Sequence, residues 1–171
     1  MLSNPPRKGE VKIRGAVREE IQEIHRVLSE SFKPYQKDYT EGAYSATVVS
    51  PDEIEKRIND PEIEVLVAVY DDKIIGTATI NLQGQEELYI ASMGVRPATQ
   101  GKGAGQRILE EIQRRARQKK CKTISLECHE PLKSAIKLYE RFGFRRTGRK
   151  RAYHGIEIFE MKKETNPGQI E

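Results

Sequence analysis

The chain lacks most of the features that mark membrane, secreted or metal-binding proteins. Its 171 residues include no tryptophan, two cysteines, three histidines and only 6% aromatic residues. No apolar run is long enough to cross a bilayer, and the first ten residues have no apolar centre of the kind that secretory signals carry. The cysteines and histidines do not have the spacing of a zinc site. We therefore expect a metal-free protein of the cytoplasm, with no part in a membrane.

The two cysteines are not expected to form a disulfide. Cys121 and Cys128 flank a run of residues typical of a strand, and seven residues of strand separate their Cα atoms by about 23 Å. A disulfide needs Cα atoms within about 7 Å of each other. Two free thiols agree with a protein of the cytoplasm.

The chain is rich in charged residues. Charged residues make up 33% of the sequence and apolar residues 36%, with a net charge of +4. The length suits one domain with a sizeable core. A basic balance suits a polyanionic partner, whether a phosphate-bearing small molecule or a nucleic acid.

Hydrophobic periodicity divides the chain into alternating strands and helices. Strands are expected over residues 11–16, 64–70, 73–81, 86–95 and 122–128 and as a hairpin within 145–162, and helices over 17–28, from Ser50 onward, 103–119 and 132–142. We expect residues 32–49 to be irregular, and residues 1–10 and 164–171 to be flexible tails of a single domain at 11–163. The mixture of hairpins and crossovers predicts an α/β (α+β) fold, in which helices cover both faces of a mixed sheet.

A glycine-rich stretch from Gln100 to Gly105 lies between an expected strand and an expected helix. Glycines allow a ligand to approach the backbone closely, and the first N–H groups of a helix bind anions. The stretch therefore predicts a phosphate or pyrophosphate site. It is not a Walker loop, because no Ser or Thr follows Lys102. It is a poor dinucleotide fingerprint, because Gln106 and Ile108 stand where Gly or Ala is needed.

A third phosphate-loop pattern, Gln/Arg-x-x-Gly-x-Gly/Ala, is filled by Gln100, Gly103 and Gly105. Residues 135–144 fill a second pattern, Ala-x-x-Leu-Tyr-x-x-x-Gly-Phe, whose apolar members share one face of a helix. The two segments resemble the pyrophosphate loop and the late helix of the GNAT family of N-acyltransferases. The resemblance implies a central, mostly antiparallel sheet of six to seven strands. It also implies transfer of an acetyl group from acetyl-CoA to a primary amine of a small molecule, peptide or protein.

The resemblance also implies which residues bind acetyl-CoA and which one donates a proton. The cofactor set comprises the strand before the loop, the loop itself and one serine: Met93, Gly94, Val95, Gln100, Gly101, Lys102, Gly103, Ala104, Gly105, Gln106 and Ser134. Tyr139 occupies the position of the family's general acid, which protonates the departing thiolate.

The general base is less clearly implied. Many relatives carry a glutamate where this chain has Ala91, and an asparagine where it has Leu132. We take Glu87 as the base, acting through a water, with Glu86 and Glu127 as alternatives. A mechanism without a base, which relies on positioning alone, is also open.

The acceptor is expected between the first helices and the last strands, as in the family. Those segments are residues 32–49, with Tyr35, Tyr39 and Tyr44, and the hairpin that carries the basic run 145–151. That run is either an edge strand that uses charge to prevent pairing or a surface for an acidic acceptor or RNA. A CoA-binding module without catalysis and a basic domain that binds RNA or proteins are the alternative functions, and no RNA-binding motif supports the second. A homodimer is also possible.

Overall fold

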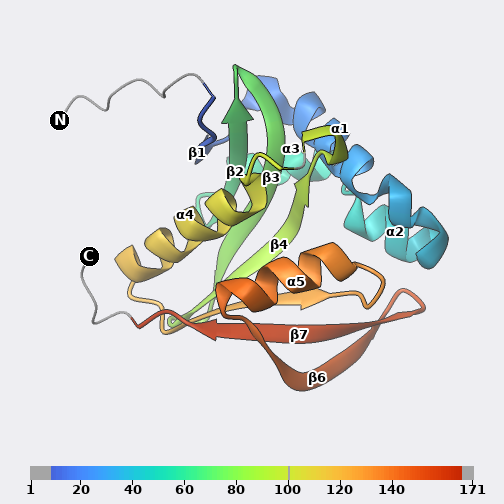
Figure 1. Cartoon of the computed structure of the whole chain (residues 1–171), viewed down its shortest axis with the longest axis vertical. Helices are drawn as coiled ribbons and strands as arrows, with labels where there is room; N and C mark the ends of the chain where they lie inside the picture. Colours follow the sequence, from blue (N-terminus) through green and yellow to red (C-terminus); the bar gives the residue numbers. More distant parts are fainter. Residues whose placement is uncertain (1–8, 100, 167–171) are drawn as a thin grey trace.

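A seven-stranded sheet forms the centre of the molecule (Figure 1). The computed structural model describes residues 9–99 and 101–166. The strands are β1 (Lys12–Gly15), β2 (Ile63–Tyr70), β3 (Lys73–Gln83), β4 (Glu87–Val95), β5 (Thr123–Cys128), β6 (Arg145–Tyr153) and β7 (Ile156–Glu164). Their spatial order is β1-β2-β3-β4-β5-β7-β6, so β7 lies between β5 and β6 although it follows both in the chain. Neighbouring strands are antiparallel except for β4 and β5.

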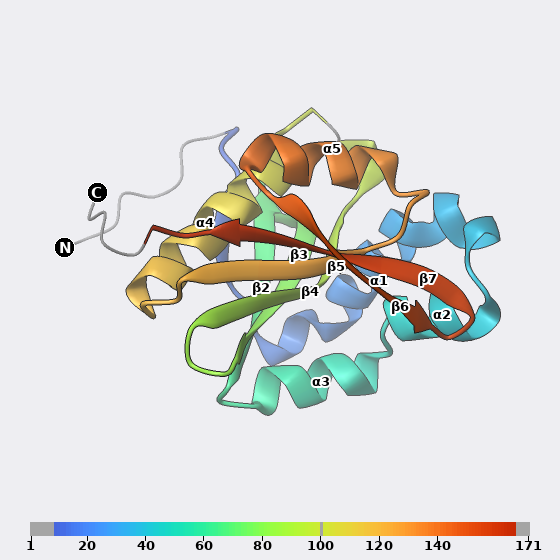
Figure 2. The same cartoon turned by 90° about the horizontal axis from the view of Figure 1, so that it is seen from below.

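Helices cover both faces of this sheet (Figure 2). On one face lie α4 (Ala104–Gln118) and α5 (Lys133–Phe142), and on the other lie α1 (Ile21–Phe32) and α3 (Pro51–Asn59). The remaining elements are the 3₁₀ turns η1 (Arg18–Glu20), η2 (Lys33–Asp38) and η3 (Pro97–Thr99) and the short helix α2 (Glu41–Thr47). The expected fold class, a mixed and mostly antiparallel sheet with helices on both faces, is confirmed.

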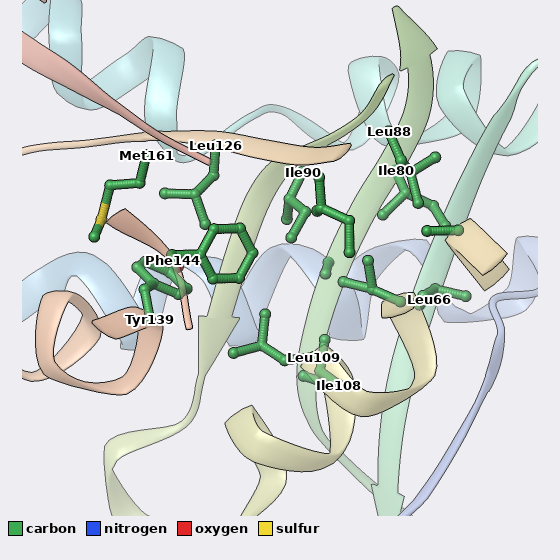
Figure 3. Packing of buried hydrophobic residues seen from close by; sticks show 14 of the residues in the cluster. Leu66, Ile80, Leu88, Ile90, Ile108, Leu109, Leu126, Tyr139, Phe144 and Met161 are labelled. Carbon is green, nitrogen blue, oxygen red and sulfur yellow. The ribbon is translucent and has the colours of Figure 1, made fainter. Parts of the chain in front are cut away.

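The core consists of one apolar layer on each face of the sheet. The larger layer joins the sheet to α4 and α5, and its buried side chains include Leu66, Ile80, Leu88, Ile108, Leu109 and Phe144 (Figure 3). The second layer joins the sheet to α1 and α3 through residues such as Ile24, Leu28 and Ile54. Each fully buried side chain of this size contributes about 1.5–3 kcal/mol. Both thiols, Cys121 and Cys128, are buried and free, as expected.

The sequence signals for turns and caps agree with the structure. Asp71 and Asp72 both have positive φ, at 47° and 63°, and form the two-residue turn between β2 and β3. The Ser50 hydroxyl accepts a hydrogen bond from the Glu53 N–H at the start of α3. Gly143 ends α5 at φ 111°, the left-handed conformation that favours glycine.

Residues 32–49 are not irregular, contrary to expectation. They contain η2 and α2, and the Thr40 hydroxyl caps α2 by accepting a hydrogen bond from the Ala43 N–H. Helix α2 has seven residues, about two turns, so it is too short to show a hydrophobic period. The sequence signal that could have indicated α2 was Thr40, a residue type that favours the N-cap position of a helix.

The domain continues past its expected end at residue 163. Strand β7 runs to Glu164, and Thr165 is fully buried. The Thr165 N–H donates to the Lys122 carbonyl oxygen at 2.9 Å, and its hydroxyl donates to the Cys121 carbonyl oxygen. Residues 1–8 and 167–171 lie outside the described residues, so the flexible tails remain a prediction.

We expect Thr165→Val to lower the free energy of unfolding by about 1–3 kcal/mol, because it leaves the buried Cys121 carbonyl without its hydroxyl donor. Urea denaturation measures this loss, and Thr165→Ser, which keeps the hydroxyl, serves as the control. A Thr165→Val protein with wild-type stability would show that this hydrogen bond does not contribute.

Candidate active site

Strands β4 and β5 separate halfway along their length. Their parallel pairing covers only Glu87–Ile90 of β4. Beyond this point β4 bulges: its register against β3 shifts between Thr77 and Thr79, and Ser92 has a φ of 49°. A cavity of about 1100 Å³ opens where the strands part, lined by both strands and by α5.

One end of this cavity has the structure of an anion site. It is lined by the β4 residues Met93, Gly94 and Val95, by Gly101, by residues 103–106 and by Ser134 of α5. Gly103 is the N-cap of α4 and has a φ of 73°, and a Cβ added there would meet no atom within 4 Å. The first N–H groups of α4 have no partner within the helix, and they start at this open bend.

One of the expected cofactor residues that the structure describes is not at the cavity wall. Lys102 does not line the cavity, and its ammonium lies over the ring of Tyr70, 5.0 Å from the ring centroid. The expectation that Lys102 contributes a charge to the phosphate site is therefore not supported. Gln100 lies outside the described residues. The other nine expected residues all line the cavity.

Tyr139 is buried and lines the cavity from α5. Its ring packs edge-on against Phe144, with the centroids 5.9 Å apart (Figure 3). Burial raises the pKa of Tyr139, and the nearby Cys128 and Tyr39 raise it further. Among the described residues its hydroxyl has no hydrogen-bond partner. A protonated phenol that is free to bond to a ligand is suited to donate a proton.

Glu87 is not positioned to act as the base. It lies at the start of β4, six residues or about 20 Å of strand before Met93. Its carboxylate forms an ion pair with the Lys162 ammonium at 2.8 Å, and it does not line the cavity. Glu86 is paired with Lys122 at 3.0 Å and is also outside the cavity. Glu87 begins β4 and Glu86 lies just before it, whereas the cavity is at the other end of the strand.

Glu127 is the one carboxylate that lines the cavity among the described residues. Arg151 donates two hydrogen bonds to it, at 2.6 and 2.9 Å, and the Tyr89 hydroxyl donates a third at 3.1 Å. The hydrogen bond from Arg151 is the main cause that lowers the pKa of Glu127. Burial and the adjacent carboxylate raise the pKa of Tyr89. Glu127 is thus an ionised carboxylate in a partly buried site, held by a neutral phenol and a cation.

The rest of the wall is largely aromatic. The rings come from residues that are distant in the sequence: Phe32, Tyr35, Tyr39, Tyr89 and Tyr153. Tyr44 does not line the cavity but packs against Tyr39, with the ring centroids 6.0 Å apart. The expected acceptor segment, residues 32–49, therefore contributes to this wall.

Two segments meet beside the aromatic wall, at the tip of the β6–β7 hairpin (Figures 1 and 2). The Thr40 hydroxyl donates to the His154 carbonyl oxygen. The two ring nitrogens of His129 lie 2.8 Å from the Asp38 carbonyl oxygen and 3.2 Å from that of Glu157. His129 therefore bridges η2 and β7.

The basic run 145–151 is largely accounted for by local contacts on edge strand β6. Ion pairs join Arg146 to Glu130, Lys150 to Glu157 and Arg151 to Glu127. Within the run, only Arg151 lines the cavity. The edge-strand interpretation agrees with these pairs.

Comparison with known proteins identifies the family. The model of the acetyltransferase (GNAT) domain matches residues 32–165. The chain belongs to the GNAT acetyltransferase family. The segments that carried the resemblance, the loop before α4 and the Tyr139 helix, both lie inside the matched range.

One curated relative shares part of the GNAT domain. The chain is 32% identical over 98 residues to the N-alpha-acetyltransferase RimI of Mycobacterium tuberculosis. The match covers 54% of this chain and 60% of RimI, so it spans less than two thirds of that relative's length.

Solved structures of GNAT proteins share the fold over nearly the whole chain. The PaiA N-acetyltransferase of Thermoplasma acidophilum, in complex with coenzyme A, has a TM-score of 0.76 at 20% identity, covering 91% of this chain and 99% of its own. The ribosomal-protein-S18-alanine N-acetyltransferase of Escherichia coli has a TM-score of 0.72 at 16% identity, covering 91% and 94%. The putative acetyltransferase yncA of Salmonella typhimurium, with acetyl-CoA, has a TM-score of 0.72 at 17% identity, covering 92% and 95%. At these identities the likeness is one of fold.

The described residues contain neither a helix that could span a membrane nor a cluster of side chains that could hold a metal ion. None of the helices in residues 9–99 and 101–166 is both long and apolar enough to span a membrane. The same part of the chain contains no group of three or more His, Cys, Asp or Glu side chains that could hold a metal ion.

We expect Arg151→Met to raise the pKa of Glu127, because it removes the cation that stabilises the carboxylate. Carboxyl-carbon NMR titration measures the pKa directly. In the wild type, the pKa of Glu127 is lower in the folded protein than in the unfolded chain. The stability that ionised Glu127 contributes is therefore present above the pKa of the unfolded chain and is lost as the pH falls through the pKa of the folded protein. The variant loses that contribution.

Arg146→Met is the matched control, since Arg146 lies on the same strand but pairs with Glu130. It should leave the titration of Glu127 unchanged. Equal shifts in both variants would mean that the net charge of β6, and not the Arg151 contact, sets the pKa of Glu127.

Proposed function

We propose that this protein is an N-acetyltransferase that transfers an acetyl group from acetyl-CoA to a primary amine. The observation that carries the proposal is one continuous cavity, which joins the glycine loop at the start of α4 to Tyr139 and Glu127. Membership of the GNAT family supports it, as do relatives named as N-acetyltransferases and relatives solved with coenzyme A or acetyl-CoA.

The cosubstrate fits the end of the cavity at β4 and α4. Among the described residues, the edge of β4 that faces β5 is unpaired beyond Ile90. At Met93–Val95 this edge therefore offers backbone groups to the pantetheine arm. The loop at Gly101 and Gly103 and the first turn of α4 offer N–H groups to the pyrophosphate. Ser134 adds a hydroxyl at the start of α5.

The chemistry needs one group that takes a proton and one that gives it. The ionised Glu127 attracts the incoming ammonium and accepts its proton. The neutral nitrogen then attacks the thioester carbonyl carbon and the C–N bond forms. As the C–S bond breaks, the leaving thiolate takes the proton of Tyr139, whose raised pKa keeps the phenol protonated until then. The nitrogen gives its second proton to the tyrosinate, which restores the phenol, and Glu127 releases the first proton to water. We therefore assign the base to Glu127 and not to Glu87.

A CoA-binding module without catalysis is the second candidate. The observation in its favour is Ala91, which replaces the glutamate that many relatives carry. Against it, Glu127 and Tyr139 line the same cavity. The identity of the amine, a location in the cytoplasm and a homodimer are predictions of the sequence alone.

A thiol-release assay separates the enzyme from the module. Acetyl-CoA is mixed with the protein and with a panel of amines that includes amino acids, their amides, simple alkyl and arylalkyl amines and short peptides. We expect at least one class to accelerate release of coenzyme A, with an N-acetyl product seen by mass spectrometry. Binding of acetyl-CoA without release for every amine would favour the module.

Tyr139→Phe removes the phenolic proton and keeps the ring. We expect kcat to fall by about 10- to 1000-fold, as for loss of a general acid, with little change in the affinity for coenzyme A. Steady-state kinetics and calorimetry measure the two quantities. Unchanged turnover, where chemistry limits the rate, would leave Tyr139 with a packing role only.

Gly103→Leu is expected to weaken acetyl-CoA binding at least tenfold. A leucine at φ 73° is strained, and its side chain would occupy the open bend that the pyrophosphate needs. Calorimetry gives the affinity and thermal unfolding monitors the fold. Gly84→Leu is the control, because Gly84 also has a positive φ in open space but lies in the β3–β4 turn, outside the cavity. Similar affinity losses in both variants would argue against the loop assignment.

A further inference from the structure

Arg57 is a cation in the cavity that the proposed chemistry does not use. It projects from α3 and lines the cavity wall, with a side chain that is only 16% exposed. Its Nη1 donates to the Ser92 hydroxyl at 2.8 Å and to the Thr79 hydroxyl at 3.3 Å. These contacts fix the guanidinium against the bulge in β4, where β4 and β5 begin to separate.

The Arg57 guanidinium keeps both an unused hydrogen-bond donor and its positive charge. Its Nε donates to Glu53, and Nη1 is used by the two hydroxyls, but Nη2 has no hydrogen-bond partner among the described residues. Glu53 does not line this cavity, and its side chain is 45% exposed, so water screens that ion pair. Arg57 therefore presents a fixed positive charge with free N–H donors, a geometry that suits a carboxylate.

The opposite charge is elsewhere on the same wall. Glu127 receives a hydrogen bond from Tyr89, which lies on β4 three residues before Ser92, the contact of Arg57. The wall thus carries both an anion for an ammonium group and a cation for an anionic group. Aromatic rings from Phe32, Tyr39 and Tyr89 complete it.

We propose that Arg57 determines acceptor specificity by binding a carboxylate, and that the acceptor is a primary amine that also carries a carboxylate, such as an amino acid or a short peptide. This inference rests on the proposed N-acetyltransferase function. A polyamine, which carries only positive charge, meets Arg57 and Arg151 as like charges and is disfavoured.

Arg57 also has a possible structural role, as a brace for the β4 bulge. The two roles make different predictions. Loss of a brace displaces the catalytic groups and lowers the rate with every acceptor. Loss of a carboxylate-binding group raises KM only for acceptors that carry a carboxylate.

The test compares matched acceptors that differ in one group. For each amino acid in the panel, rates are measured for the free acid, its carboxamide and the corresponding decarboxylated amine, such as phenylalanine, phenylalaninamide and 2-phenylethylamine. For the best amino acid, we expect the wild-type kcat/KM for the free acid to be at least tenfold higher than for its carboxamide or its decarboxylated amine. Activity with decarboxylated amines and none with acids would overturn the inference while leaving the proposed function intact. No activity with any amine would instead overturn the proposed function.

Variants of Arg57 then locate the preference. Arg57→Gln should raise KM for the free acid about 10- to 100-fold, as for loss of a charged hydrogen bond, and change kcat/KM for the decarboxylated amine less than twofold. Arg57→Lys keeps the positive charge but loses the paired N–H donors of the guanidinium. Its KM for the free acid should lie between those of the wild type and Arg57→Gln. It provides the same comparison if Arg57→Gln does not fold.

Glu53→Gln is the matched control, because it removes the outer partner of Arg57 and leaves the guanidinium. It should keep the preference for the free acid. An equal loss with all acceptors in Arg57→Gln, at unchanged affinity for coenzyme A, would assign Arg57 to bracing and refute its role in specificity.

Discussion

The separation of β4 from β5 is the constraint on which the site depends. A sheet normally pairs each strand edge to the end, because unpaired backbone groups are costly to bury. Here a bulge at Ser92 ends the pairing after Ile90, and the second half of β4 turns away from β5. The gap leaves backbone donors and acceptors free for a ligand. It also gives Tyr139, which lies on one face of the sheet, access to the cavity. Groups from the other face of the sheet line the same cavity.

The protonation state of each group in the cavity determines what that group can do. Glu127 stays ionised because Arg151 and Tyr89 donate to it, whereas burial keeps the Tyr139 phenol neutral. Cys128, which also lines the cavity, has its pKa raised by burial to about 12, so its thiol is protonated and a weak nucleophile. Among the described residues, an acyl group bound here therefore meets the Glu127 carboxylate, the Tyr139 phenol and no competing thiolate.

Features coded locally could be predicted from the sequence, and features formed by distant contacts could not. The loop, the Tyr139 helix, the Asp71–Asp72 turn and the succession of elements along the chain depend on short motifs and periodicity. Glu127 and Arg57 owe their roles to partners that lie 24 and 35 residues away, Arg151 and Ser92. Glu87 failed as the base for the complementary reason: the sequence identifies its strand but not which end of that strand opens.

The position of β7 between β5 and β6 has a consequence for how the molecule folds. Strand β6 pairs only with β7, so until β7 is in place β5 is an open edge and β6 has no strand neighbour. The tip of the same hairpin supplies Tyr153 to the cavity wall and the His154 carbonyl to Thr40. The acceptor side of the site thus depends on a contact between residues 114 positions apart, the kind of contact that slows folding. The cofactor loop, which joins β4 to the helix that directly follows it, does not depend on that contact.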